Sequence, residues 1–210
     1  MAVVSVASSQ EVLDVLGTPP GSWPRADRLP PRDRQDFLAA RQLGVALASY
    51  ATGRTWVAAD LRQSCPTCGG TDHGRPSLGD LSVSWSHAAG VVAAVVGEGV
   101  AAAVDVQPLA DVSAVADVLP EELLGPGGDP VSSWVRREAL VKLGLLSLDR
   151  AIALTEDEVD GRDDTTSACW VDLPTGTCVA VVLRPSSQRV DSSLETIDTE
   201  RLRAALSAVH

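Results

Sequence analysis

Short hydrophobic runs along the chain predict six strands. Residues 81–85, which read Leu-Ser-Val-Ser-Trp, alternate hydrophobic and polar positions with the period of a half-buried strand. Continuous hydrophobic runs of similar length predict buried strands. The six predicted strands cover residues 3–6, 81–85, 91–96, 101–106, 168–173 and 177–183. Segments of hairpin length, including a turn at residues 86–90, separate the three strands between 81 and 106, so we expect an antiparallel sheet there.

Hydrophobic residues at helical spacing predict five helices. The strongest pattern covers residues 32–50, in which Phe37, Leu38, Val45 and Leu47 occupy hydrophobic positions at helical spacing. The predicted helices cover residues 10–16, 32–50, 111–118, 134–142 and 199–208, and the predicted loops cover residues 19–31, 65–76 and 125–130. Each half of the chain combines helices with a small antiparallel sheet. This order predicts an α+β fold whose halves meet near residues 98–104.

The composition is that of a globular protein with a strong negative charge. The 210 residues are 45% hydrophobic and 21% charged, so the chain can bury a substantial core. A net charge of −11 argues against a nucleic-acid partner. The N-terminus lacks the pattern of a signal peptide, and no hydrophobic run reaches the length of a membrane span. We therefore expect a cytoplasmic protein without membrane association, whose four cysteines are reduced.

The helix predicted over residues 134–142 carries the most informative polar residues. Trp134, Glu138 and Lys142 are spaced i, i+4, i+8 and share one face, and Arg137 is expected beside them. Lys142 is the only lysine among 17 basic residues, which indicates that a compact ammonium is required there. Taken alone, an exposed Glu–Lys pair that contributes a few tenths of a kcal/mol remains the simpler interpretation.

An acid and an amide follow each other on one face of a predicted strand. Asp105 and Gln107 are two residues apart and therefore project from the same side. Their oxygens suit a hard cation such as Mg²⁺, and Glu138 could supply another carboxylate. A structural role for Asp105 as a cap of the following loop is the alternative.

Two further groups of residues are candidates for ligand binding. Ser86 and His87 follow a predicted strand and could donate hydrogen bonds to a phosphate, although a structural histidine is the alternative. Cys65, Cys68 and His73 have a spacing similar to that of zinc knuckles, but a closed site needs a fourth ligand, such as Asp72 or Cys169. We expect free thiols in a surface loop, with zinc binding as the alternative.

Short motifs in a fixed order resemble those of one enzyme family. They are Phe-Leu-Ala-Ala-Arg at residues 37–41, Cys-Pro-Thr-Cys-Gly at 65–69, Gly-Arg-Pro at 74–76, Ser-Trp-Ser-His at 84–87, Ala-Val-Asp-Val-Gln at 103–107, and Trp-Val-Arg-Arg-Glu-Ala-Leu-Val-Lys at 134–142. Together they resemble the 4′-phosphopantetheinyl transferases of the larger, pseudo-dimeric class typified by the surfactin-synthetase activator. The chain departs from the family pattern at three positions: Ala103 replaces a glycine, Gln107 the usual second acid, and Arg137 a lysine.

The resemblance implies a fold and a reaction. The fold has two similar α/β lobes related by pseudo-twofold symmetry, each with a small, mainly antiparallel sheet packed with helices, here residues 1–100 and 101–210 with the active site in the cleft between them. The reaction transfers the 4′-phosphopantetheine group of coenzyme A to a serine of an acyl or peptidyl carrier protein and releases adenosine 3′,5′-bisphosphate. It requires Mg²⁺, for which Mn²⁺ can substitute, and we expect the protein to be a monomer.

The resemblance also assigns roles to individual residues. Asp105 and Glu138 are expected metal ligands, with Gln107 as a weaker or water-mediated one. Glu138 can also act as the base, and Lys142 stabilises the transferring phosphate or the leaving group. The expected coenzyme A ligands are Arg41, Arg75, Ser86, His87 and Lys142. Two other functions remain open: a non-catalytic relative that binds coenzyme A or a carrier protein, and an interaction module stabilised by zinc at Cys65, Cys68 and His73.

Overall fold

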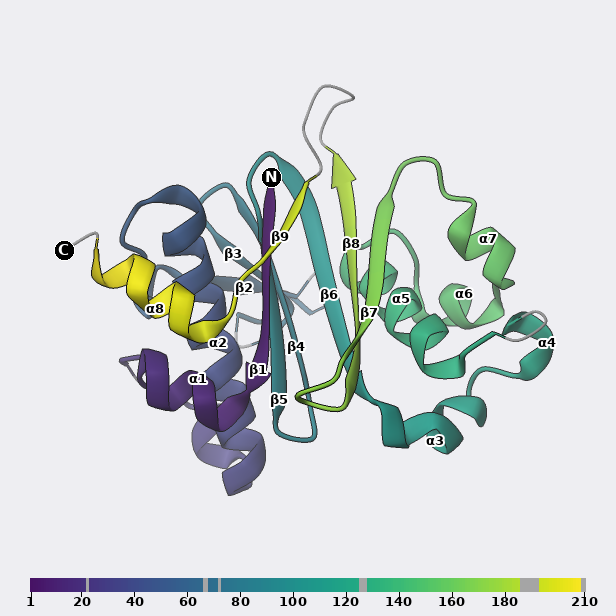
Figure 1. Cartoon of the computed structure of the whole chain (residues 1–210), viewed down its shortest axis with the longest axis horizontal. Coiled ribbons are helices and arrows are strands. Elements are labelled where there is room, and N and C mark those ends of the chain that lie inside the picture. The colour runs from purple at the N-terminus through teal and green to yellow at the C-terminus, as the bar shows by residue number, and fades with distance from the viewer. Residues whose placement is uncertain (22, 66–67, 72, 125–127, 186–192, 209–210) are drawn as a thin grey trace.

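The structure is a mixed α/β fold with two sheets between two groups of helices (Figure 1). It is a computed structural model that describes residues 1–21, 23–65, 68–71, 73–124, 128–185 and 193–208. Helices α1, α2 and α8 cover the outer face of the larger sheet, and α5, α6 and α7 lie beyond the smaller one (Figure 1). No helix in these ranges is both long and apolar enough to cross a membrane.

The larger sheet has six strands in the order β2-β3-β4-β5-β1-β9. Their bounds are β1 (Ala2–Ser8), β2 (Arg62–Ser64), β3 (Arg75–Leu78), β4 (Leu81–Ala88), β5 (Val91–Gly97) and β9 (Leu194–Thr196). Its helices are α1 (Ser9–Leu16), α2 (Pro31–Thr52) and α8 (Thr199–Ser207), with short 3-10 helices η1 (Ala26–Arg28) and η2 (Ala58–Asp60). Every pair in this sheet is antiparallel except β1–β9, which is parallel.

The smaller sheet has three antiparallel strands in the order β6-β8-β7. Their bounds are β6 (Val100–Pro108), β7 (Thr166–Asp172) and β8 (Thr177–Pro185). The helices of this half are η3 (Leu109–Asp111), α3 (Val112–Ala116), α4 (Glu121–Leu124), α5 (Pro130–Lys142), α6 (Leu148–Ala153) and α7 (Glu156–Asp160).

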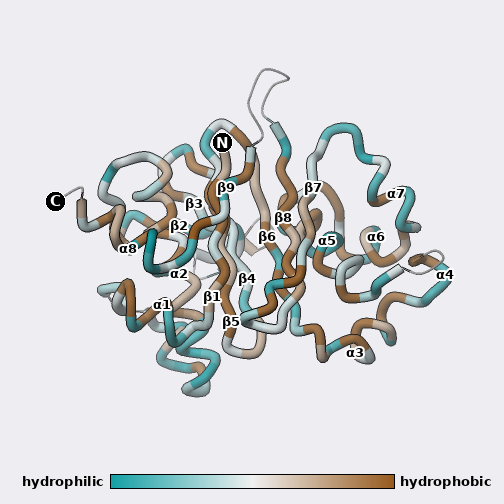
Figure 2. Tube along the Cα trace, in the orientation of Figure 1, coloured by the Kyte–Doolittle hydropathy of each residue, from teal (hydrophilic) through white to brown (hydrophobic). Residues whose placement is uncertain are grey.

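The two sheets pack against each other through a valine- and alanine-rich core. Val4, Val95, Val104 and Val181 are all fully buried in this interface and come from β1, β5, β6 and β8. A second core lies between the larger sheet and α2, so every residue of β5 is buried. This double coverage explains why β5 is a continuous hydrophobic run without alternation. Figure 2 shows hydrophobic residues along the central strands of both sheets.

All predicted strands and helices are present, but the pairing of β6 differs from the prediction. β5 and β4 form the expected hairpin, whereas β6 leaves that sheet and pairs with β8. The chain turns sharply between the two sheets, and a Cβ atom at Gly97 would lie 2.4 Å from the carbonyl oxygen of Val100. Glycine at this position lets the strands separate into two layers.

Three other sequence predictions were wrong in part. Ser86, His87 and Ala88 continue β4 instead of forming a turn, and Arg75 and Pro76 belong to β3 instead of a loop. Short elements without a periodic pattern were missed, namely β2, β9, α4, α6 and α7. The expected boundary at residues 100/101 does not hold for the C-terminal segment, because β9 pairs with β1 and α8 packs beside α1 and α2.

Candidate active site

Helix α5 lies across the smaller sheet with Glu138 and Lys142 toward β6. The side chain of Asp129 caps its N-terminus by accepting a hydrogen bond from the Ser132 amide at 3.0 Å, and Pro130 occupies the first turn. Buried residues fix the helix on the sheet: Val131 and Val135 pack on β8, and Ala139 packs on Ala103 and Val182. These hydrophobic contacts of α5 with the sheet therefore fix the positions of Glu138 and Lys142.

Arg137 does not share the face of Glu138 and Lys142, so its expected position was wrong. Its guanidinium is fully buried and donates hydrogen bonds to the carbonyls of Ala151 and Leu154, at 2.6 and 2.9 Å, and to Glu156 at 3.0 Å. One residue of a helix turns by about 100°, which directs Arg137 toward α6 and α7. We assign it a structural role in joining these helices to α5.

Trp134 is also directed away from the site. It packs against Val115, Leu119, Leu123 and Leu124 in the small core beneath α3 and α4. Of the four residues predicted to share one helix face, only Glu138 and Lys142 therefore lie at the site.

Asp105 on β6 is the centre of the polar cluster. Its carboxylate is 1% exposed, and Oδ1 lies 2.5 Å from Nζ of Lys142 and accepts a hydrogen bond of 2.7 Å from Ser86. Lys142 is 32% exposed and also approaches the carbonyl of Val104 at 3.4 Å. The other oxygen, Oδ2, is buried without a hydrogen-bond partner among the described residues. A buried carboxylate oxygen in this state is a ready ligand for a cation.

Glu138 completes an acidic pair with Asp105. Burial, then the neighbouring charge of Asp105, and also a hydrogen bond between the two carboxyl groups raise the pKa of Glu138 to about 7, although Lys142 opposes the shift. Two carboxylates that share a site resist ionising together, and a divalent cation relieves that repulsion. The unpartnered oxygen of Asp105 and the raised pKa of Glu138 therefore both fit a Mg²⁺ site.

Gln107 follows Asp105 on β6, but its amide is engaged with an acid that the sequence analysis missed. Its Nε2 donates a hydrogen bond of 2.8 Å to Asp111 in η3. Asp111 lies only four residues further along the chain, so its proximity to Gln107 could have been inferred from the short segment between them. The pair brings a third carboxylate to the end of β6.

Ser86 and His87 point to opposite faces of β4. Ser86 is buried and bonds to Asp105, whereas Nδ1 of His87 lies 4.0 Å from Asp36 on α2. Burial lowers the pKa of His87, while Asp36 acts in the opposite direction. The side chain of His87 is 44% exposed and remains accessible on that face. The two residues predicted to bind the same phosphate therefore have different neighbours, because consecutive strand residues alternate.

Three serines of β4 attach this strand to the open edge of β6. Ser82 accepts a hydrogen bond of 2.9 Å from the amide of Ala102, Ser84 accepts one of 3.3 Å from Val104, and Ser86 bonds to Asp105. The serines are two residues apart and so lie on one face of the strand. They satisfy backbone groups of β6 that β8 does not pair, and they position Asp105.

Arg75 lies at a pocket beside Lys142. This pocket, of about 600 Å³, is lined by Arg75, Trp85, Val141 and Lys142, among others, between β3, β4 and the end of α5. Arg75 approaches the carbonyl of Leu143 at 3.4 Å and Ser82 at 3.2 Å, which joins the two sides of the pocket. Two of the predicted ligand-binding cations therefore meet at one cavity.

Arg41 lies beside a second pocket of about 320 Å³. This pocket is also lined by Trp23, Arg25, Arg28 and Phe37. The guanidinium of Arg41 lies 3.2 Å from the ring centre of Phe37 and 5.1 Å from that of Trp85. Burial, and then the charge of Arg25, lowers the pKa of Arg41 to about 9. Since Nε has no partner among the described residues, an anion in this pocket would offset the burial of the cation.

Comparison of the chain with models of known protein families gave no match, and a search of curated proteins gave no significant match. The interpretation of the site therefore depends on its geometry and on the motifs that occupy it.

The role of Gln107 can be tested by substitution with glutamate. Gln107→Glu removes the hydrogen-bond donor to Asp111 and adds a second acid to the strand that carries Asp105. We expect tighter Mg²⁺ binding, because an additional carboxylate increases the charge of the site. We also expect a less stable metal-free protein, because like charges then face each other. Calorimetric Mg²⁺ titration measures the affinity, and thermal unfolding measures the stability. Asp111→Asn serves as a second variant in both measurements. Unchanged Mg²⁺ affinity would exclude position 107 from the metal site.

Proposed function

We propose that the protein is a Mg²⁺-dependent 4′-phosphopantetheinyl transferase that acts on an acyl or peptidyl carrier protein. The main support is the convergence of Asp105, Glu138 and Lys142, from two separate motifs, beside a pocket that also contains Arg75. A purely structural Glu–Lys pair would not require a buried aspartate with an unpartnered oxygen. Phosphoryl transfer needs this combination of carboxylates for a metal and cations for phosphate oxygens.

The two pockets suit the two ends of coenzyme A. Arg41, Arg25 and Arg28 provide positive charge for the nucleotide phosphates, and Trp23 and Phe37 provide aromatic surface beside it. Arg75 and Lys142 provide charge at the larger pocket of about 600 Å³, close to the acidic pair. Trp85 lines the larger pocket, and its ring lies 5.1 Å from the guanidinium of Arg41, so the two cavities lie near each other. A bound coenzyme A would extend from the cationic aromatic pocket toward Asp105.

Asp105 and Glu138 would hold the cation. Gln107 and Asp111 lie near the end of β6, the strand that carries Asp105. When bound, Mg²⁺ would supply charge neutralisation on the pyrophosphate. The hydroxyl oxygen of the carrier serine attacks the β-phosphorus, and the bond from that phosphorus to the bridging oxygen breaks. Glu138 takes the hydroxyl proton, directly or through water, and Lys142 stabilises the charge on the departing adenosine 3′,5′-bisphosphate.

The two sheets, each covered by helices on its outer side, support the assignment of two lobes of the pseudo-dimeric class. We propose that they are related by the pseudo-twofold symmetry of that class, and that the protein acts as a cytoplasmic monomer.

Mass spectrometry of an apo-carrier protein tests the function. Incubation with this protein, coenzyme A and Mg²⁺ should add one phosphopantetheine group to the carrier, and omission of Mg²⁺ should prevent it. Binding of coenzyme A without modification of any carrier in a panel of acyl and peptidyl types would instead support a non-catalytic relative.

Metal binding should depend on pH through Glu138. The carboxyl is largely protonated below a pKa of about 7, and the proton must leave before a metal binds. Mg²⁺ affinity should therefore rise by up to about tenfold per pH unit between pH 6 and 7 and level off above pH 7. Calorimetric titrations at pH 6, 7 and 8 measure this, and Glu138→Gln should bind weakly with a flat profile. Equal affinity of the wild-type protein at pH 6 and pH 8 would contradict the assignment of Glu138 as a ligand.

A further inference from the structure

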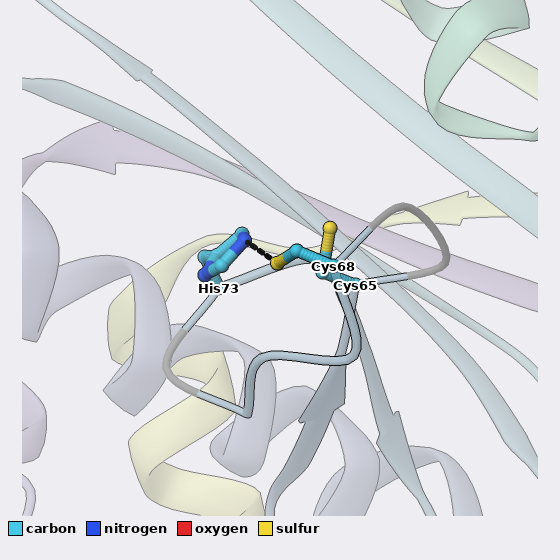
Figure 3. Close-up of side chains that lie close together, drawn as sticks. All are labelled: Cys65, Cys68 and His73. Atoms are coloured by element: carbon cyan, nitrogen blue, oxygen red, sulfur yellow. Dashed lines mark hydrogen bonds between the residues drawn. The ribbon is translucent and has the colours of Figure 1, made fainter.

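Three metal-binding side chains converge at the tip of the β2–β3 hairpin (Figure 3). Cys65, Cys68 and His73 each offer one donor atom, and these atoms all lie within 4.8 Å of one another. Sγ of Cys68 is 3.1 Å from Nε2 of His73. The ligand atoms of a tetrahedral zinc site are roughly 3.4–3.8 Å apart, as follows from bond lengths of about 2.0–2.3 Å. The most distant of these atoms would have to approach by about one ångström, and Cys68 and His73 would have to separate by a few tenths of an ångström, to coordinate a zinc ion.

The backbone around the cluster has the hydrogen bonds of a compact metal-binding turn. The amide of Gly69 donates to the carbonyl of Cys65, and the amide of Cys65 donates to the carbonyl of Gly70, both at 2.9 Å. The amide of Gly70 also approaches the Cys68 sulfur at 3.4 Å, and such a donor stabilises a thiolate ligand. These contacts orient the two cysteines before any metal is bound.

Glycine at position 70 leaves the space that the cluster needs. A Cβ atom there would lie 2.7 Å from the His73 ring and 3.3 Å from the Cys68 sulfur. The close approach of His73 to Cys68 therefore depends on the absence of a side chain at Gly70.

The sequence of the hairpin tip contains no large hydrophobic residue. Residues 65–74 read Cys-Pro-Thr-Cys-Gly-Gly-Thr-Asp-His-Gly, without a large apolar side chain. Strand pairing ends at Ser64 and Arg75, so the sheet does not extend into this segment. Small loops without a core commonly obtain their folding energy from a structural metal.

We propose that Cys65, Cys68 and His73 bind one Zn²⁺ ion that stabilises the β2–β3 hairpin. Both thiols bind as thiolates and release their protons, and His73 binds through a neutral ring nitrogen. Three protein ligands leave the fourth tetrahedral position to a water molecule or another small ligand. Asp72, the fourth ligand considered from the sequence, lies outside the described residues, and Cys169 lies instead on β7, where its sulfur is 3.5 Å from that of Cys178. Because His73 is two residues before Arg75, where β3 begins, the ion would fix the start of that strand.

Zinc analysis of the purified full chain tests this proposal independently of transferase activity. After incubation with Zn²⁺ and removal of the excess, elemental analysis should find about one zinc per chain. Cys65→Ser/Cys68→Ser should retain less than about a tenth of that amount. Cys169→Ser is the matched control, because it removes an exposed thiol outside the cluster, and it should retain a full equivalent.

Two further measurements distinguish a built site from casual thiol binding. Gly70→Ala keeps all three donors but obstructs His73, so its zinc affinity should fall at least tenfold in a competition assay with a chromogenic chelator. Cobalt substitution should give the intense visible bands of a tetrahedral ion together with a thiolate charge-transfer band. The proposal is overturned if the wild-type chain binds zinc no more tightly than the Cys65→Ser/Cys68→Ser variant, or if Gly70→Ala and the wild type have equal affinity.

Discussion

Asp105→Ala should reduce transfer to a carrier protein at least about a thousandfold, equivalent to roughly 4 kcal/mol of transition-state stabilisation. Asp105 is the most buried acid of the site, it bonds to both Lys142 and Ser86, and its second oxygen is unpartnered among the described residues. Its removal would take away a proposed metal ligand and would also release the ammonium of Lys142 from its position. Single-turnover transfer, followed by mass spectrometry across a Mg²⁺ titration, measures the loss.

Two variants show whether the loss is chemical or structural. Asp105→Asn preserves the shape and should be almost as inactive, because a neutral amide cannot replace the charge toward a cation or Lys142. Ser86→Ala removes one donor to the carboxylate and should cost only about tenfold, the usual order for a hydrogen bond to a charged group. Circular dichroism and thermal unfolding should confirm that all three variants are folded. Transfer by Asp105→Ala at the wild-type rate would show that the metal assignment is wrong.

Lys142→Arg should slow transfer by roughly tenfold or more even though it preserves the charge. Lys142 is the only lysine of the chain, it lies 2.5 Å from Asp105, and it lines the pocket that contains Arg75. Arginine is a longer and planar fork, so its charge would be displaced from the point that the ammonium occupies. A misplaced charge that costs about 1.4 kcal/mol of barrier slows the reaction tenfold.

Lys142→Ala should be slower still, with coenzyme A binding less affected than turnover. Single-turnover transfer and equilibrium binding of coenzyme A separate these two effects, because a group that acts mainly in the transition state changes rate more than affinity. Arg136→Lys, on the same helix but paired with Glu156 and Asp160, is the matched control and should transfer normally. Normal turnover in both Lys142 variants would reduce Lys142 to a structural partner of Asp105 and remove the main support for the catalytic assignment.

The sequence predicted elements well where a local period was strong. The alternation of residues 81–85 and the helical spacing of residues 32–50 required no knowledge of the rest of the chain. The first segment forms β4, and the second forms α2. Strands β2 and β9 have only three residues each, too few to show a period, and they exist because a neighbouring strand pairs with them. The position of β6 in a separate sheet was likewise beyond local information, because strand pairing is decided by contacts distant in sequence.

By itself, the sequence determined that Glu138 and Lys142 share a helix face and that Asp105 and Gln107 share a face of a strand, since these relations follow from the 3.6- and 2-residue periods. Only the tertiary structure decided that the two motifs meet at the edge of β6. It also directed Arg137 into the contact with α6 and α7, separated Ser86 from His87, and brought Asp111 to Gln107. A local period fixes the direction of a side chain relative to its own element. Which partner it meets, and therefore whether a charge is buried, paired or available for a ligand, depends on how the elements pack against one another.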